Sequence, residues 1–474
     1  MMAGLSPDSV RGLNREIFRL AVPSIIANIT IPIVGMVAIA VVGHLEGDSS
    51  FSTAALIGGI SIGSMIFDLM YWNFGFLRTG TGGFTAQAYG RGDTVECADI
   101  FVRAEGIALL CAAFLLAVQW LVVKVALMVV DASPEVEYLA QSYFYVRVWA
   151  APATLSLMAI KGWLIGMQDG FSPMLTDIVV NVVNIVLSIV LTLGVHWGVA
   201  GGFWAVDYAG IGFIGVAKAT VIAQYSGFAV GLALVFGKYR RVFASYTGAA
   251  LRSAFRGPEV RAFFRTNADL FVRSLCFIGI YIGFTTIAAG FGDLILATSS
   301  IMMQLMMLFS YITDGFAYAG EALTGRFVGG RNLVQLRRTV LWTFIWSFAV
   351  TSAFIVAYGS CGQAMLRLLT SDADVLSCGA DFLVWLLLMP VAGCAAFTWD
   401  GIFTGATGTA HMRNSMLLAV AAYFALFYAC DALFNKAGDG ITGLHILLGA
   451  YCIHLVLRTV YLSLAYRSGV LAKV

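Results

Sequence analysis

Several side chains that can ionise lie inside long apolar stretches of this 474-residue sequence, where a charge is costly. Asp68, Asp314 and Asp400 have mostly apolar residues on both sides. A carboxylate at membrane depth usually faces neighbouring helices or a water-filled cavity, and it can carry a proton or hold a cation. We therefore treat these three carboxylates as candidate cation-coupling residues. A structural carboxylate, hydrogen-bonded to neighbouring helices, is the alternative for Asp68.

The helical spacing around Asp68 places small and polar side chains on one face of the second apolar stretch. These residues recur at intervals of three or four positions, as one face of a helix requires: Ser61, Ser64, Asp68, Tyr71 and Gly75. About 15 Å of helix separates Asp68 from Arg78, so Asp68 is expected near mid-bilayer. Tyr71 is a secondary candidate for the wall of a cavity.

A second polar face follows the fifth apolar stretch, where Asp177, Asn181, Asn184 and Ser188 share helical spacing. Such a face can hold water or a cation, so Asp177, Asn181 and Asn184 are candidates for this role. The alternative is structural, because amide side chains also join membrane helices by hydrogen bonds.

Lys161 and Asp400 each directly precede a Gly-x-x-x-Gly motif, so they occupy equivalent positions in two parts of the chain. Lys161 is expected to extend toward the nearby membrane surface. A fixed ion pair between Lys161 and Asp400 across a cavity is the alternative.

The seventh and eighth stretches carry further polar residues. One face of the eighth contains Gln304, Tyr311, Asp314, Tyr318 and Glu321. We expect Glu321 to form a salt bridge with Arg326 or another arginine at the same membrane surface. Asp269 and Arg273, four residues apart, are expected to pair with each other on the seventh stretch. Gln304, Asp269 and Arg273 are therefore secondary cavity candidates.

Composition identifies the elements that must position these residues. Hydrophobic residues make up 60% of the chain and charged residues only 11%, with a formal net charge of +2. Soluble domains contain about a quarter charged residues, so this chain cannot cover a water-facing surface. Neither a basic run with aromatics, nor a nucleotide-binding loop, nor metal-ligand spacing among the eight cysteines and five histidines is present. We therefore expect no nucleic-acid partner, no cofactor, no metal and no enzymatic activity.

The apolar stretches are long enough to cross a bilayer as helices, since lipid cannot satisfy backbone polar groups. Twelve spans are predicted, near Ile17–His44, Phe51–Leu77, Ala98–Val123, Tyr138–Ile165, Pro173–Trp197, Tyr208–Phe236, Arg261–Phe291, Ile295–Tyr318, Leu336–Ser360, Gly379–Thr404, Asn414–Phe434 and Ile441–Tyr466. The fold class is thus an all-α polytopic membrane protein.

Charges in the loops indicate the orientation. Loops after even-numbered spans are basic, with Arg78, Arg91, Arg103, Lys238, Arg240, Arg241, Arg252, Arg256, Arg326, Arg331, Arg337 and Arg338. Loops after odd-numbered spans are short or acidic, with Glu46, Asp48, Asp131, Glu135, Asp207, Asp293, Asp372, Asp374 and Asp439. The positive-inside rule therefore predicts that both termini lie in the cytoplasm.

The chain also repeats itself at one constant offset. The segment Thr85–Asp93 matches Thr324–Asn332, and Gly162–Gly166 matches Gly401–Gly405. The repeat predicts two pseudo-symmetric six-helix lobes around a central cavity, a transporter architecture. We place the N-lobe at 1–237, a basic cytoplasmic linker at 238–260 and the C-lobe at 261–474.

These repeated segments resemble the multidrug and toxic compound extrusion family. Leu20–Ile25, Gly35–Leu45, Trp72–Arg78 and Asp314–Glu321 look like its DNA-damage-inducible F branch. The resemblance covers nearly the whole chain. It implies twelve helices in two lobes and the export of drugs or organic cations against inward movement of H⁺ or Na⁺. It also makes Asp400 a coupling candidate, because family members often use a tenth-span carboxylate.

One position departs from that branch. The first span of the branch usually carries an aspartate, regarded as the N-lobe proton site, where this chain has Ala38. The fifth span often has an aspartate four residues after an asparagine, whereas here Ser188 follows Asn184. Either coupling takes place elsewhere, or the chain is a coupling-deficient variant.

Together these features predict a monomeric, multi-pass inner-membrane antiporter. It would export amphipathic or cationic small molecules by alternating access, with H⁺ favoured over Na⁺ as the coupling ion. The alternative is a flippase for lipids or lipid-linked sugars, which would need a cavity rich in Arg or Lys; Lys161 and Arg273 are the bases available for it.

Overall fold

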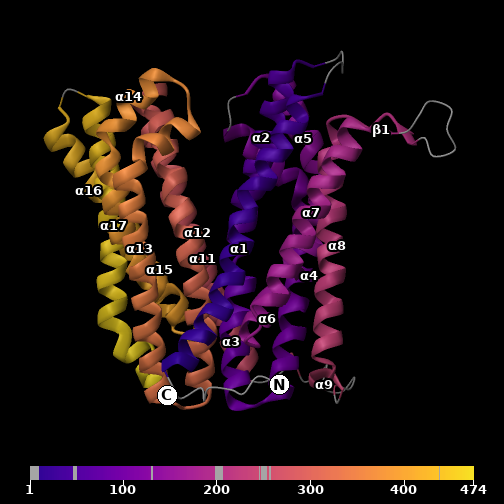
Figure 1. Ribbon diagram of the computed structural model, residues 1–474, viewed down its shortest axis with the longest axis vertical. Coiled ribbons are helices and arrows are strands. Elements are labelled where there is room, and N and C mark those ends of the chain that lie inside the picture. Colours follow the sequence, from indigo (N-terminus) through magenta and orange to yellow (C-terminus); the bar gives the residue numbers. More distant parts are fainter. Residues whose placement is uncertain are drawn as a thin grey trace.

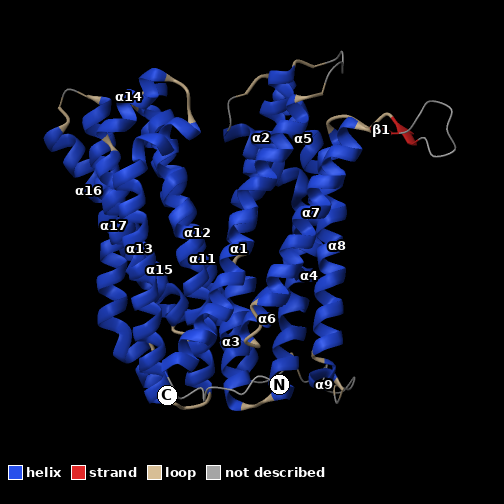
Figure 2. Cartoon of the chain, viewed as in Figure 1, coloured by secondary structure: helices blue, strands red, loops and turns tan. Residues whose placement is uncertain are grey.

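The computed structural model describes residues 10–45, 51–129, 132–197, 206–244, 246, 254–255, 258–436 and 438–474. Helices make up nearly all of this part of the chain (Figure 2). Some loop charges used above to predict orientation lie outside the described residues: Glu46, Asp48, Asp131, Arg252 and Arg256.

The first group of helices contains α1 (Val10–Gly43), α2 (Thr53–Asn73), α3 (Phe76–Arg91), α4 (Thr94–Val129), α5 (Pro134–Arg147), the 3₁₀ helix η1 (Val148–Ala150), α6 (Ala151–Gly166), α7 (Phe171–Leu193) and α8 (Ile214–Lys238). The second contains α11 (Pro258–Gly290), α12 (Asp293–Gly329), α13 (Leu333–Leu369), α14 (Ala373–Asp381), α15 (Leu383–Gly405), α16 (Thr409–Phe434), α17 (Gly440–Gly469) and η2 (Leu471–Lys473). The short α9 (Arg240–Phe243) lies within the segment predicted as a linker, and α11 begins slightly before that segment ends.

Twelve helical stretches of the described chain are long and apolar enough to span a membrane, which confirms the predicted number. Two of these spans are interrupted. The second consists of α2 and α3, with a break at Phe74–Gly75, and the fourth consists of α5, η1 and α6. The predicted end of the second span at Leu77 is therefore too early. A charge was taken as the end of the helix, but Arg78 has a partner within the protein and the helix continues to Arg91.

The loop between α7 and α8 contains a small ribbon that the sequence analysis did not predict. Strand β1 (Val195–Trp197) pairs antiparallel with β2 (Val206–Tyr208). Its valines and aromatic residues favour strand, and they had been assigned to the end of one helix and the start of the next.

Several helices begin with an N-cap residue whose side chain accepts a hydrogen bond from the first turn. The hydroxyl of Ser52 accepts a hydrogen bond from the backbone N–H of Ala55 at the start of α2. The Asp439 carboxylate does the same for the N–H of Thr442 at the start of α17. Each cap satisfies a backbone donor that the first turn leaves without a partner.

The two groups of helices form two lobes. They converge at the end of the molecule where α1 begins and α17 ends, here called the terminal end, and diverge toward the opposite end (Figure 1). One buried apolar cluster crosses between the lobes on the terminal side, joining residues such as Leu77 and Trp163 to Phe316 and Phe403. A separate cluster fills the rest of the second lobe.

The repeated motifs form equivalent contacts within the two lobes. A Cβ atom on Gly162 of α6 would lie 2.1 Å from the backbone oxygen of Arg78 in α3. Its equivalent on Gly401 of α15 would lie 2.0 Å from the oxygen of Ala317 in α12. Since each glycine lets two helix backbones touch, the matching motifs specify the same helix packing twice.

A further pair of glycines joins the lobes to each other. A Cβ on Gly90 of α3 would lie 2.0 Å from the oxygen of Arg326 in α12, and a Cβ on Gly329 of α12 would lie 2.0 Å from the oxygen of Gln87 in α3. Gln87 and Arg326 occupy equivalent positions of the repeat. We call this contact between α3 and α12 the lobe junction.

Candidate functional site

The C-lobe places Asp400 of α15 between two arginines from other helices. One carboxylate oxygen, Oδ2, accepts hydrogen bonds from Arg273 of α11 at 2.5 Å and from Arg458 of α17 at 2.6 Å. The Arg458 side chain is only 2% exposed, and the sequence analysis missed it although it lies inside the twelfth span. Buried charges need such partners because burial removes them from water. The tenth-span carboxylate is therefore part of an ion triad.

The predicted pairing of Asp269 with Arg273 is wrong. Asp269 accepts hydrogen bonds from Arg413 at 2.5 Å and from the Thr409 hydroxyl at 3.3 Å, both at the start of α16. Arg273 reaches Asp400 instead. Helical spacing places Asp269 and Arg273 on one face of α11, but each forms its ion pair with another helix. The partner of Asp269 lies on α16 and that of Arg273 on α15.

The N-lobe contains an ion pair between Lys161 of α6 and Asp177 of α7. Their side chains are 23% and 25% exposed, so the pair is partly open to its surroundings. The interpretation that Lys161 extends to the membrane surface is wrong, and so is its alternative, a pair with Asp400. Lys161 is held within its own lobe, although its position is equivalent to that of Asp400.

The polar face of α7 divides between two neighbouring helices. The amide of Asn181 donates to the Thr30 hydroxyl of α1 at 2.5 Å. Asn184 is buried, donates to the Thr220 hydroxyl of α8 at 3.2 Å and accepts from Ser188 at 3.0 Å. These hydrogen bonds join α7 to its neighbouring helices. Of the predicted residues on this face, only Asp177 has a charged partner.

At the lobe junction, Arg78 of α3 reaches across to the second lobe. Its guanidinium lies 3.4 Å from Glu321 of α12 and 4.0 Å from the centre of the Tyr318 ring. The expectation that Glu321 pairs with an arginine is confirmed, with Arg78 as the partner, while Arg326 pairs with Glu16 at 3.1 Å.

Asp314 links this junction to the C-lobe triad. Its carboxyl lies close enough to interact electrostatically with Arg78 on one side and with Asp400, Arg273 and Arg458 on the other. The Lys161–Asp177 pair adjoins these residues through Tyr318, which interacts electrostatically with both Asp177 and Arg78. The resulting charge cluster has four acidic and four basic members: Lys161, Asp177, Arg78, Asp314, Glu321, Asp400, Arg273 and Arg458. With all carboxyls ionised its formal charge is zero, so proton uptake by any carboxyl would leave an uncompensated positive charge.

Asp68 lies apart from this cluster, on the diverging side of the molecule. It is exposed, and it interacts electrostatically with Arg147 of α5 and with Tyr281 and Tyr311 of the second lobe. Arg147 itself donates to Ser64 at 3.3 Å, on the polar face that the spacing predicted. Asp68 is therefore an exposed carboxylate between the two lobes.

Three other predicted residues do not join the cluster through a polar contact. Tyr71 packs its ring against Phe67, with centroids 5.6 Å apart. Gln304 is exposed on α12, about 15 Å along the helix from Asp314. Ala38 packs against the apolar cluster that crosses between the lobes. The described residues contain no group of three or more His, Cys, Asp or Glu side chains placed to hold a metal ion.

A charged contact at the turn between α6 and α7 ties this turn to the end of α8. Asp169 accepts hydrogen bonds from the Ser172 hydroxyl and from Lys238, both at 2.6 Å. Burial alone would raise the pKa of Asp169, but the hydrogen bonds from Lys238 and Ser172 bring it below its ordinary value. This contact fixes α8 to the N-lobe at the terminal end.

Two six-helix lobes with charged residues at their contact are the architecture of secondary transporters. The family model described as MatE matches residues 23–190 and 270–424. The chain belongs to the multidrug and toxic compound extrusion family, whose members are multidrug efflux transporters and not enzymes. They use an ion gradient in place of a cofactor.

Similar proteins support the assignment. DNA damage-inducible protein F of Escherichia coli is 32% identical over 426 residues, covering 90% of this chain and 87% of that protein. Human multidrug and toxin extrusion protein 1 is 22% identical over 396 residues, covering 82% and 64%. A crystal structure of a MATE in the bent conformation has a TM-score of 0.79 at 16% identity and covers 98% of both chains.

Proposed function

We propose that the protein exports amphipathic or cationic small molecules by alternating access, driven by inward movement of H⁺ in preference to Na⁺. The observation that carries this proposal is the neutral charge cluster where the lobes meet. Arg78 holds Glu321 across the lobe junction, whereas Asp400 and Asp177 are held by bases of their own lobes, so protonating one of these carboxylates weakens a contact at or beside the junction. Proton binding and lobe movement would thereby be linked.

Within this proposal Asp400 and Asp177 are the coupling carboxylates, and Asp314 and Glu321 transmit the change to the junction. Asp68, Asn181 and Asn184 would contribute to the polar wall of the path. Ala38 leaves the N-lobe without the carboxylate usual in the resembling branch, and the pair of Lys161 with Asp177 is the nearest available substitute in that lobe.

The lobes would correspond to residues 1–237 and 261–474, joined by a basic linker at 238–260. We place both termini in the cytoplasm, in the inner membrane of the cell, and regard the chain as a monomer. Since the lobes converge at the terminal end, the described conformation would open away from the cytoplasm.

The flippase alternative gains no support from the cluster. Lys161, Arg273 and Arg458 are each held by a carboxylate, so they are not available as an unpaired basic surface for a diphosphate. Export of small molecules is supported instead by the family, whose members are multidrug efflux transporters.

Reconstitution in vesicles tests the proposal. We expect efflux of a fluorescent organic cation to depend on an imposed pH gradient and to be unaffected by a Na⁺ gradient of the same size. Asp400→Asn should abolish the dependence. Ala38→Asp should raise the coupling if the missing carboxylate limits it. Efflux that ignores both gradients would indicate the coupling-deficient alternative and refute the proposal.

A further inference from the structure

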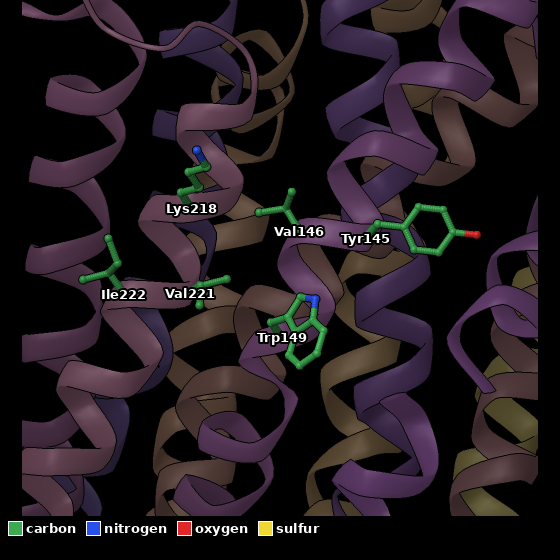
Figure 3. Close-up of a pocket in the computed structure, with 6 residues that line it drawn as sticks. All are labelled: Tyr145, Val146, Trp149, Lys218, Val221 and Ile222. Carbon is green, nitrogen blue, oxygen red and sulfur yellow. The ribbon is translucent and has the colours of Figure 1, made fainter. Parts of the chain in front are cut away.

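A groove lies on the outer side of the first lobe, between α8 and the segment formed by α5 and η1 (Figure 3). Its volume is about 360 Å³, and it is lined by Tyr145, Val146, Trp149, Lys218, Val221 and Ile222. Trp149 is 56% exposed and Ile222 45% exposed. None of the lining residues belongs to the charge cluster, so the groove is separate from the candidate transport site.

The position of the groove indicates what covers it. Both α5 and α8 belong to spans of the membrane, so their exposed apolar side chains face lipid. The 25 residues of α8 extend for about 37 Å, a few ångströms beyond each side of a hydrocarbon layer of about 30 Å. Lys218 is four residues, about 6 Å, from the start of α8, on the side of the membrane opposite the termini. Its side chain is long enough to reach the head-group region.

The polar groups in the groove are donors. Among the described residues, neither the Lys218 ammonium nor the Trp149 indole N–H has a hydrogen-bond or ion-pair partner. Figure 3 shows the Lys218 side chain beside Val221, with Tyr145 directed away from it. The lining contains one base and no carboxylate. This combination matches a phosphate with a net negative charge better than a zwitterionic head group, which also needs an anionic partner.

We propose that the groove binds one anionic phospholipid. The phosphate lies at Lys218, and an acyl chain follows Val221, Ile222 and the Trp149 ring along the groove toward the membrane interior. A lysine near an anionic head group contributes about 1 kcal/mol, which corresponds to an affinity about fivefold higher.

Native mass spectrometry of the full-length protein tests the proposal, with phosphatidylglycerol and phosphatidylcholine added in turn. We expect one phosphatidylglycerol to bind in preference to phosphatidylcholine, and Lys218→Ala to weaken that binding about fivefold. Lys218→Arg should retain it. Lys124, an exposed lysine near the end of α4 on the same side of the membrane, is the matched control, and Lys124→Ala should leave binding unchanged.

A second variant separates the groove from its charge. Val221→Trp fills the space between the helices but keeps Lys218, so it should also displace the lipid. The proposal is overturned if Lys218→Ala behaves like Lys124→Ala, if the two lipids bind equally, or if Val221→Trp retains phosphatidylglycerol. A dimer that dissociates in Lys218→Ala would show that a second copy covers the groove, and would overturn it too.

Discussion

Replacing Gly90 with alanine tests whether the lobe junction is a movable contact. The new Cβ would lie 2.0 Å from the backbone oxygen of Arg326, whereas ordinary contact begins near 3.4 Å. The α3 and α12 backbones must therefore separate by about 1.4 Å. Overpacking of this kind costs about 1–3 kcal/mol. That cost applies only while the lobes are in contact at this end.

The substitution also has a favourable effect, which must be separated from the clash. Alanine stabilises a helix interior by about 0.5–1 kcal/mol relative to glycine. This gain is present whether or not the lobes touch, so it cancels from the equilibrium between conformations. The clash therefore decides that equilibrium. It lowers the ratio of conformations with the lobe junction closed to those with it open by about 5- to 150-fold. An open state populated at about 1% would rise to roughly 5–60%.

Hydrogen exchange followed by mass spectrometry measures this shift at the terminal ends of α3 and α12. We expect faster exchange there in Gly90→Ala. Gly401→Ala is the control for a clash within one lobe, because its Cβ would meet Ala317 at 2.0 Å in every conformation. A Cβ on Gly237 would have no atom within 4 Å, so Gly237→Ala reports the effect of helix propensity alone. Exchange at the junction that matches the Gly237→Ala variant would refute the reasoning.

Three further substitutions test single contacts. Asp400→Asn removes the partner of two guanidinium groups, which should destabilise the protein by about 3–5 kcal/mol, and an unchanged unfolding temperature would contradict the triad. Asp269→Asn should release Arg413, seen as faster exchange at the start of α16, without altering coupled efflux; a loss of coupling would place Asp269 in the transport site. Asp169 has a pKa that burial alone would raise but hydrogen bonds, chiefly from Lys238, bring below its ordinary value. Its stabilisation is therefore complete above the unfolded-state pKa of about 3.9 and is lost as the pH falls toward the lower folded value. Unfolding measured between about pH 2 and 5 should show this acid-dependent loss in the wild type and not in Asp169→Asn.

The sequence was sufficient to predict the helices and the lobes, because both depend on properties that can be counted. Twelve spans follow from apolar length, and the repeat follows from glycines that recur at one offset. The breaks within the second and fourth spans could not be predicted this way. They arise at Phe74–Gly75 and at η1, where local geometry changes without a change in hydropathy.

The charged residues were identified more reliably than their partners. Asp400, Asp177 and Lys161 are predictable because a charge in an apolar stretch is conspicuous. The partner of Arg273 is not, since helical spacing reveals only contacts along one helix and this partner lies on α15. Arg458 was missed although the same rule of conspicuous charge applied to it, and a complete list of ionisable residues in the twelfth span would have included it.

The reciprocal contacts of Gly90 and Gly329 across the lobe junction are those of a two-fold symmetric interface, in which each surface meets its own equivalent. In a dimer of two identical six-helix subunits, every substitution would occur on both sides at once. Lysine at one position would then face lysine at its equivalent. A single chain that carries both halves has no such restriction, so it can place Lys161 in one half and Asp400 in the other. Joining the halves thus allows an electrically polarised transporter to retain a symmetric frame.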